Sequence, residues 1–376
     1  MEFRDLKRQY QYLKSDMDLR IQEVIKQTNF IQGKQVAELE QQLAAYTGVK
    51  HCVSCANGTD ALQLALMVWN IGEGDAVFVP DFTFFSSGEV VSAVNAVPVF
   101  VDIESDTYNI DCNSLEILIQ RMIEKGRLRP KAIIAVDLFG QPADYRRLRK
   151  IAEKYQMYIL EDAAQGFGGK IEDKMACSFG DISTTSFFPA KPLGCYGDGG
   201  AIFTDNDEWA ALLKSYCVHG KGNSKYDNVR IGMNSRLDTL QAAILLAKFP
   251  AFSEKELDWM QKIAAKYTEQ LKDVVKTPFV KEGFYSSWAQ YTIQLSDKAV
   301  RDGLQTYLKE QGLPSAVYYQ KPMHKQAAFE KNAYDDNDYP IANKLSETVL
   351  SLPFHPYMKE KEIILVTDTI KSYLRR

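Results

Sequence analysis

Several features that mark other classes of protein are scarce in this sequence of 376 residues. It has no long basic run, and 45 Lys and Arg face 49 Asp and Glu, so we do not expect it to bind a nucleic-acid backbone. Its longest stretch of low charge, residues 239–247, is far shorter than the roughly 20 residues of a membrane span. Five of the first eight residues are charged and no secretory apolar segment follows, so we expect a cytoplasmic protein.

Cysteine is also sparse, with six residues, and a chain of this length needs no disulfides for stability. Cys52 and Cys55 form a C-x-x-C pair, which admits a redox or zinc interpretation. They lie in a strand-like run, however, and residues i and i+3 of a strand point to opposite faces. No second cysteine or histidine pair completes four ligands. We therefore expect buried thiols and no metal site.

What is present is a repeating pattern of apolar strand, turn and amphipathic helix, after two N-terminal helices. The expected strands are 76–80, 97–103, 132–138, 156–161 and 183–188. Their near-continuous apolar character predicts an α/β fold with a mostly parallel central sheet flanked by helices. From about residue 254 the pattern changes to a long amphipathic helix and strands near 291–295 and 316–319. We expect a large α/β domain (1–250) and a small C-terminal α+β domain (251–376).

Ligands of open parallel sheets bind at the carboxyl ends of the strands, which directs attention to three motifs. The first, Asn57-Gly58-Thr59-Asp60, lies between a strand and a helical run. Asn-Gly permits a tight turn, Thr59 and Asp60 can cap the helix, and free N–H groups at a helix start can hold a phosphate. Plain helix capping explains this motif equally well.

The second motif is Asp162, which ends an apolar strand, with Gln165 three residues later. A carboxylate at a buried strand end needs a positive or hydrogen-bonding partner, and a protonated ring nitrogen would serve. A simple helix cap is the alternative.

The third motif is Lys191, which stands between Ala190 and Pro192 beside hydroxyls and aromatics, with glycines downstream. Loss of water around an ammonium lowers its pKa and favours the nucleophilic amine. Such a lysine can form a Schiff base with an aldehyde cofactor, although most lysines are solvated surface groups. A phosphate cradle, an acid for a pyridinium nitrogen and a desolvated lysine together meet the needs of pyridoxal 5'-phosphate.

The whole chain resembles the fold type I sugar aminotransferases of the DegT-like family, which aminate nucleotide-linked keto-sugars. The resemblance rests on NGTDAL, PDFTFF, EDAAQ, SFFPAK, GDGGA and NSRLDTLQAA, in that order. It implies that Lys191 binds the cofactor and shuttles a proton, and that Asp162 pairs with the pyridinium nitrogen. It further implies a set of residues around the cofactor. Gln165 would contact the phenolic oxygen, and Phe84 would stack on the pyridine ring. The backbone N–H groups of Gly58 and Thr59 and the hydroxyl of Ser186 would hold the phosphate.

The resemblance also extends to the partner subunit and the substrate. Asn234 and Arg236 resemble a loop that reaches a neighbouring subunit's site, Asn234 at the phosphate and Arg236 at an anionic substrate group, which implies a homodimer with composite sites. Tyr318 and Tyr319 resemble the small-domain segment that faces the nucleotide, although many relatives have histidine where Tyr318 stands. Some relatives with histidine in place of the lysine remove oxygen instead, so Lys191 favours transamination.

The stretch from residue 187 to 202 is most similar to enzymes that aminate C3 of a UDP-linked 3-keto-N-acetylglucosaminuronic acid, with L-glutamate as the expected amino donor, in surface glycan or lipopolysaccharide biosynthesis. A neutral TDP- or UDP-linked 3-keto or 4-keto sugar is the alternative substrate. Two remoter alternatives are a non-catalytic homologue, such as a regulator, and a thiol or zinc protein.

Overall fold

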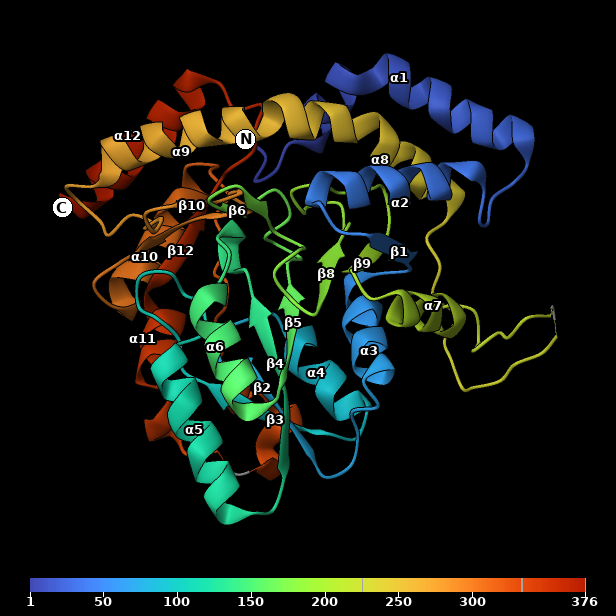
Figure 1. Cartoon of the computed structure of the whole chain (residues 1–376). Helices are drawn as coiled ribbons and strands as arrows, with labels where there is room; N and C mark the ends of the chain where they lie inside the picture. The colour runs from blue at the N-terminus through green and yellow to red at the C-terminus, as the bar shows by residue number, and fades with distance from the viewer. Residues whose placement is uncertain (225, 333, 376) are drawn as a thin grey trace.

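The computed structural model describes residues 1–224, 226–332 and 334–375, and a seven-stranded sheet forms its centre (Figure 1). The strand order is β1-β9-β8-β5-β4-β2-β3. Its members are β1 (His51–Cys55), β2 (Asp75–Pro80), β3 (Val97–Val101), β4 (Arg129–Val136), β5 (Tyr158–Asp162), β8 (Ile182–Ser186) and β9 (Gly200–Thr204). The neighbours from β8 to β3 pair in parallel, whereas β9 is antiparallel to both β8 and β1. The expected mostly parallel sheet is therefore confirmed.

Helices cover both faces of this sheet, and its alternating side chains divide into two hydrophobic cores. Phe78 and Ile133 belong to one core, together with residues of α2, α5, α6 and α8. Val77 and Ile134 belong to the other, with residues of α3, α4 and α7. Because neighbours along a strand face opposite ways, nearly continuous apolar runs fit a sheet that is buried on both sides. The helices are α2 (Lys34–Thr47), α3 (Gly58–Val68), α4 (Ser86–Ala93), α5 (Cys112–Lys125), α6 (Tyr145–Tyr155), α7 (Asp207–Tyr216) and α8 (Thr239–Ala251).

A long helical path crosses the molecule along the top of Figure 1. There α8 passes through a π-helical turn at residues 252–256 into α9 (Leu257–Leu271), and α1 (Leu6–Gln27) packs against α8. The expected division at residues 250/251 falls in the last turn of α8, so the proposed domains share this helical path. No helix in the described ranges is long and apolar enough to cross a membrane.

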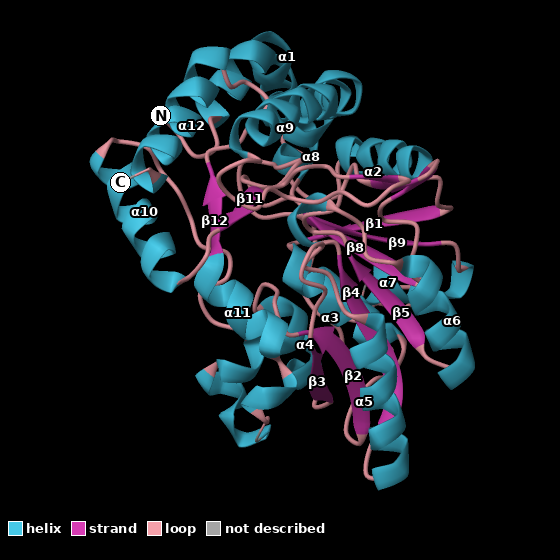
Figure 2. Cartoon of the chain, turned by 90° about the vertical axis from the view of Figure 1, so that its left-hand side faces the viewer, coloured by secondary structure: helices cyan, strands magenta, loops and turns pink. Residues whose placement is uncertain are grey.

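The C-terminal part builds a second, smaller sheet, set apart from the central one in Figure 2. Its strands, β11 (Tyr291–Gln294) and β12 (Val349–Leu352), pair antiparallel. The expected strand at 316–319 was wrong: only Ala316 forms an isolated bridge, to Ser351. Flanking helices are α10 (Lys298–Glu310), α11 (Pro340–Thr348) and α12 (Glu360–Leu374), and β10 (Phe284–Tyr285), β6 (Lys170–Ile171) and β7 (Lys174–Met175) form a third small sheet.

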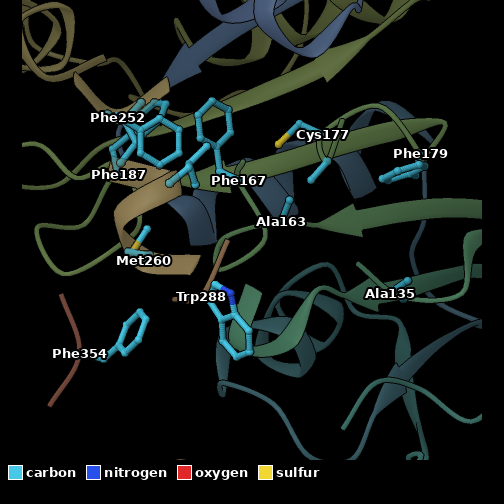
Figure 3. Packing of buried hydrophobic residues seen from close by; sticks show 14 of the residues in the cluster. Ala135, Ala163, Phe167, Cys177, Phe179, Phe187, Phe252, Met260, Trp288 and Phe354 are labelled. Carbon is cyan, nitrogen blue, oxygen red and sulfur yellow. The ribbon is translucent and has the colours of Figure 1, made fainter. Parts of the chain in front are cut away.

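Aromatic packing fixes the segments that follow β5 and β8. Phe167, after β5, stacks on Phe252 with ring centroids 5.6 Å apart and meets Phe187, after β8, edge-on at 6.5 Å. All three rings are buried, and Figure 3 shows them gathered in one cluster. The two segments that carry the acid and lysine motifs are thus anchored to a common core.

Candidate functional site

Four segments meet at one edge of the central sheet. Strands β2, β5 and β8 run parallel and end there. Because β9 is antiparallel to both of its neighbours, β1 also ends at this edge. The Asn57 turn, the segment after Pro80, Asp162 and the Lys191 loop therefore converge, as the rule for open parallel sheets predicts.

The first segment forms a narrow cradle at the start of α3. Asn57 caps this helix, because its Oδ1 accepts a hydrogen bond from the backbone N–H of Asp60 at 2.8 Å. The expectation that Thr59 or Asp60 caps it was wrong: the residue before the helix has the extended backbone that a cap requires. A Cβ at Gly58 would lie 2.8 Å from the Cβ of Ser186. Glycine leaves room there for an anion between the helix start and the Ser186 hydroxyl.

Asp162 ends β5 with its carboxylate buried at this edge, where it is 5% exposed. Its Oδ2 accepts a hydrogen bond from Ser87 Oγ at 2.9 Å, and its Oδ1 accepts one from the backbone N–H of Ala164 at 3.2 Å. Burial raises the pKa of Asp162, while the Ser87 hydrogen bond and the charge of Lys191 lower it. The carboxylate has too few donors for a buried charge, and a cationic ligand nitrogen would supply one.

The preceding residue, Glu161, points to the other face and shows the contrast. Its carboxylate accepts hydrogen bonds from three backbone N–H groups and from Ser183 Oγ. Glu161 thus has hydrogen-bond donors enough for its charge and joins β5 to residues 177–183, whereas Asp162 lines the cavity.

Lys191 lies in the loop that follows β8, half-buried, and lines the same cavity as Asp162. Its backbone N–H bonds to the Phe188 carbonyl at 2.8 Å. Burial lowers the pKa of its amine. The charge of Asp162 raises this pKa, and the charge of Arg4 lowers it further. The amine and the acid therefore lie close enough to influence one another, and burial shifts the balance toward the neutral, nucleophilic amine.

The cavity has a volume of about 770 Å³. Phe84, 54% exposed, lies at its wall with its ring centroid 6.4 Å from that of Tyr319. Gln165 accepts from the backbone N–H of Phe139 at 2.9 Å and donates through Nε2 to Tyr319 Oη at 3.0 Å. All the residues expected around the cofactor except Asn234 line it, as do Tyr318 and Tyr319; the others are Gly58, Thr59, Phe84, Asp162, Gln165, Ser186 and Lys191.

These residues fit pyridoxal phosphate. The space at Gly58 suits its phosphate, and the amine of Lys191 suits its aldehyde. The buried carboxylate of Asp162, which accepts only two hydrogen bonds among the described residues, suits its ring nitrogen. The exposed ring of Phe84 offers a face for stacking.

Asn234 and Arg236 do not join this cavity. They hydrogen-bond to each other, and Arg236 lines a separate pocket of about 260 Å³ with Gly33 and Ser54. Both lie on the segment between α7 and α8, on which Ile231 is 90% exposed. Their expected roles in a neighbouring subunit's site stay predictions.

Sequence reasoning missed two polar groups at the site. Ser87, in the first turn of α4, directly supports Asp162. Gln290 lines the cavity, and its Oε1 is buried without a hydrogen-bond partner among the described residues. Ser87 could have been found, because it follows β2 at the ligand-binding edge; Gln290 comes from the distant C-terminal part and gave no signal.

The cysteine pair has the geometry of a structural strand. Cys52 belongs to the core on one face of the sheet and Cys55 to the core on the other. Burial raises the pKa of both thiols. Within the described ranges, no three His, Cys, Asp or Glu residues are grouped to hold a metal ion.

Comparison with known proteins agrees with this geometry. The model of the DegT/DnrJ/EryC1/StrS aminotransferase family matches residues 11–371. The UDP-2-acetamido-2-deoxy-3-oxo-D-glucuronate aminotransferase of Pseudomonas aeruginosa is 44% identical over 99% of this chain and its own full length. A pleiotropic regulatory protein of Geobacillus stearothermophilus is 40% identical over 99% of this chain and 98% of its own.

Solved structures give the same result. A DegT DnrJ EryC1 StrS aminotransferase from Brucella abortus superposes with a TM-score of 0.97 at 47% identity, covering both chains completely. A putative sugar aminotransferase of Streptococcus pneumoniae, solved in its PMP form, has a TM-score of 0.89 at 25% identity over 96% of each chain.

Proposed function

The chain belongs to the DegT/DnrJ/EryC1/StrS aminotransferase family, and we propose that it moves an amino group from L-glutamate to C3 of a UDP-linked 3-keto-N-acetylglucosaminuronic acid. It is a transaminase that uses pyridoxal phosphate. The observation that carries the proposal is the shared cavity of Lys191 and Asp162 at the sheet edge, in a chain 44% identical to an aminotransferase with such a substrate in its name.

Bound pyridoxal phosphate supplies an aldehyde that takes up amines and a cationic ring that draws electrons from the bond being broken. Lys191 would hold the aldehyde carbon, and its Nζ would accept and return the proton that moves during amino transfer. Burial lowers the pKa of this amine, which favours its action as a base. Asp162, held by Ser87, would keep a proton on the ring nitrogen, because a buried carboxylate is stabilised by an adjacent positive charge.

The remaining residues bind and orient. Backbone N–H groups of Gly58 and Thr59 and the hydroxyl of Ser186 would hold the phosphate at the start of α3. Phe84 would stack on the ring, and Gln165, already tied to Tyr319, would donate to the phenolic oxygen.

A cation near the cavity mouth supports an acidic sugar. Of the described residues that line the cavity, the cationic ones are Lys191 and Lys321. Lys321 is exposed and forms no ion pair within the part of the chain described, so its ammonium is free to meet a carboxylate. Lys321→Met should raise KM for the uronate substrate and leave KM for a neutral keto-sugar unchanged.

The proposed enzyme is a homodimer in which Asn234 and Arg236 complete the partner's site, with Asn234 at the phosphate and Arg236 at an anionic substrate group. The separation of these residues from their own cavity and the exposure of Ile231 beside them support this arrangement. Tyr318 and Tyr319 would face the nucleotide. We place the reaction in the cytoplasm, in surface glycan or lipopolysaccharide synthesis.

The decisive experiment incubates enzyme, pyridoxal phosphate and glutamate with a panel of nucleotide keto-sugars and identifies products by mass spectrometry. Amination of the UDP-3-keto uronate in preference to neutral TDP- or UDP-linked 3-keto and 4-keto sugars is the expected result. Preference for a neutral sugar would overturn the substrate, while absence of any amino-sugar would favour the regulator alternative.

A matched pair of lysine variants tests the chemistry. Lys191→Ala should abolish turnover, and borohydride should fix the cofactor to one peptide containing Lys191 in the native enzyme. Lys298→Ala, which removes an exposed lysine at the start of α10, should retain the cofactor and the activity. Activity in Lys191→Ala equal to that of the native enzyme would refute the role of Lys191.

A further inference from the structure

The residues before α1 lie against the loop that carries Lys191. The carbonyl of Phe3 accepts a hydrogen bond from the backbone N–H of Phe354 at 3.0 Å, and its ring meets that of Tyr318 edge-on at 6.3 Å. Asp5 then caps α1 by accepting from the backbone N–H of Arg8 at 2.9 Å. Arg4 is thus fixed on both sides, between a backbone contact and a helix cap.

The guanidinium of Arg4 holds the catalytic loop by its main chain. Its Nη2 donates to the Lys191 carbonyl at 2.8 Å and to the Pro192 carbonyl at 3.2 Å. Its Nη1 is buried and has no hydrogen-bond partner among the residues described. One guanidinium nitrogen, Nη2, therefore binds two successive carbonyls, while the other, Nη1, is a buried donor without a partner in the described part of the chain.

No carboxylate in the described part of the chain forms an ion pair with Arg4. Glu256 is the acid whose charge raises the pKa of Arg4, while burial lowers it more. The Glu256 carboxylate itself accepts from Gln9 Nε2 at 3.0 Å. An arginine stays protonated even when buried, so an incompletely compensated positive charge lies beside the backbone of Lys191.

We propose that Arg4 is a positioning residue for Lys191: through its hydrogen bonds to the Lys191 and Pro192 carbonyls, its guanidinium fixes the main chain from which the amine projects and places a positive charge beside it. Burial lowers the pKa of the amine; of the two charges that also act on it, that of Asp162 raises the pKa and that of Arg4 lowers it. Asp198 also lines the cavity. The proposal rests on the proposed role of Lys191 and adds a residue that is not among those lining the cavity.

A second buried cation provides a matched comparison. Lys248, on α8, is 1% exposed, donates through Nζ to the Gly194 carbonyl at 2.7 Å and lies 4.2 Å above the ring of Tyr196. It supports the same loop three residues further along. The charges that shift the pKa of the Lys191 amine, however, are those of Asp162 and Arg4. Lys248→Met therefore loosens the loop without the direct charge effect.

The experiment measures the amine in the absence of cofactor. Full-length apoenzyme is labelled with acetic anhydride across a pH series, and mass spectrometry follows acylation of the peptide containing Lys191. We compare Arg4→Met and Arg4→Gln, which remove the charge, with Arg4→Lys, which keeps it. Lys248→Met controls for loop support, and Lys7→Met, with a side chain 86% exposed, controls for charge on the same segment.

The midpoint of Lys191 acylation should move to higher pH in Arg4→Met and Arg4→Gln, and stay near the native value in Arg4→Lys, Lys248→Met and Lys7→Met. Arg4→Gln keeps an amide donor for the carbonyls, so it reports on the charge if Arg4→Met does not fold. An unchanged midpoint in Arg4→Gln, or an equal shift in Lys248→Met, would overturn the proposal.

A separate readout distinguishes this outcome from failure of the proposed function. Borohydride reduction of each variant after loading with pyridoxal phosphate should label Lys191 in every case. Labelling with an unchanged midpoint refutes only the role of Arg4, whereas no labelling of the native protein refutes the role of Lys191.

Discussion

Ser87→Ala is the sharpest test of how the site holds its acid. The substitution removes the hydroxyl that donates to Asp162 Oδ2 at 2.9 Å and that also lies 3.3 Å from Thr83 Oγ1. Alanine is smaller than serine and is a good helix former, so it fits this buried position of α4. A hydrogen bond to a charged group contributes about 1.5–3 kcal/mol. Its loss disfavours the carboxylate that pairs with the cofactor ring, so the pKa of Asp162 should rise further.

If the full hydrogen-bond energy is expressed in binding, the dissociation constant of pyridoxal phosphate should rise about 10- to 100-fold. Equilibrium dialysis with absorbance detection measures this constant directly. Ser92→Ala, at an exposed position of the same helix, is the control and should bind as the native chain does.

A double-mutant cycle tests whether Ser87 affects cofactor binding through the carboxylate of Asp162. In an Asp162→Asn background the hydroxyl no longer meets a charge, so removal of Ser87 should weaken binding much less. Native affinity in Ser87→Ala, or an equal loss in both backgrounds, would refute the reasoning.

Three further predictions concern the cradle, a buried histidine and the thiols. Gly58→Ala should weaken cofactor binding and destabilise the fold by about 1–3 kcal/mol through the clash with Ser186, whereas Gly72→Ala, with only an ordinary contact at 3.5 Å, should do neither in dialysis and urea titrations. Burial lowers the pKa of His355 to about 4. Between pH 6.5 and 4 the unfolded chain therefore binds a proton at this histidine that the native state does not bind, and the free energy of unfolding should fall by about 3 kcal/mol as the pH drops. Urea titrations at each pH measure this dependence, which His355→Gln should lack. The six cysteines are free and buried, so a thiol reagent should leave the native protein and its bound cofactor unchanged and react fully only after denaturation; rapid reaction of the folded protein would contradict their burial.

Local signals predicted the central sheet and the positions of the chemical groups well. Asp162 ends β5 and Lys191 follows β8, and parallel strands bring their carboxyl ends to one edge of the sheet. The helix at 34–47 ends at Gly48 in the left-handed conformation, with φ of 74°, as its glycine indicates.

Contacts between distant segments were the part that sequence could not supply. Strand β9 follows a glycine-rich stretch and has a short apolar run, so the sequence alone did not predict it. The structure identifies it as a strand because it pairs with both β1 and β8. Arg4 reads as an ordinary charged residue near a helix start, and its contact with Lys191 joins positions 187 residues apart. The sequence also predicted a strand at 316–319, where only Ala316 forms a bridge, and did not single out β12, which pairs with β11.

The place of β1 at the sheet edge has a consequence for biosynthesis. Its hydrogen-bonding partner, β9, follows roughly 150 residues later in the chain. At a translation rate of about 5–20 residues per second, a nascent chain therefore carries this strand unpaired for roughly 8–30 seconds. During that interval the emerging polypeptide exposes a strand edge to neighbours on the same messenger, and holdase chaperones at the ribosome exit should improve the yield of native enzyme.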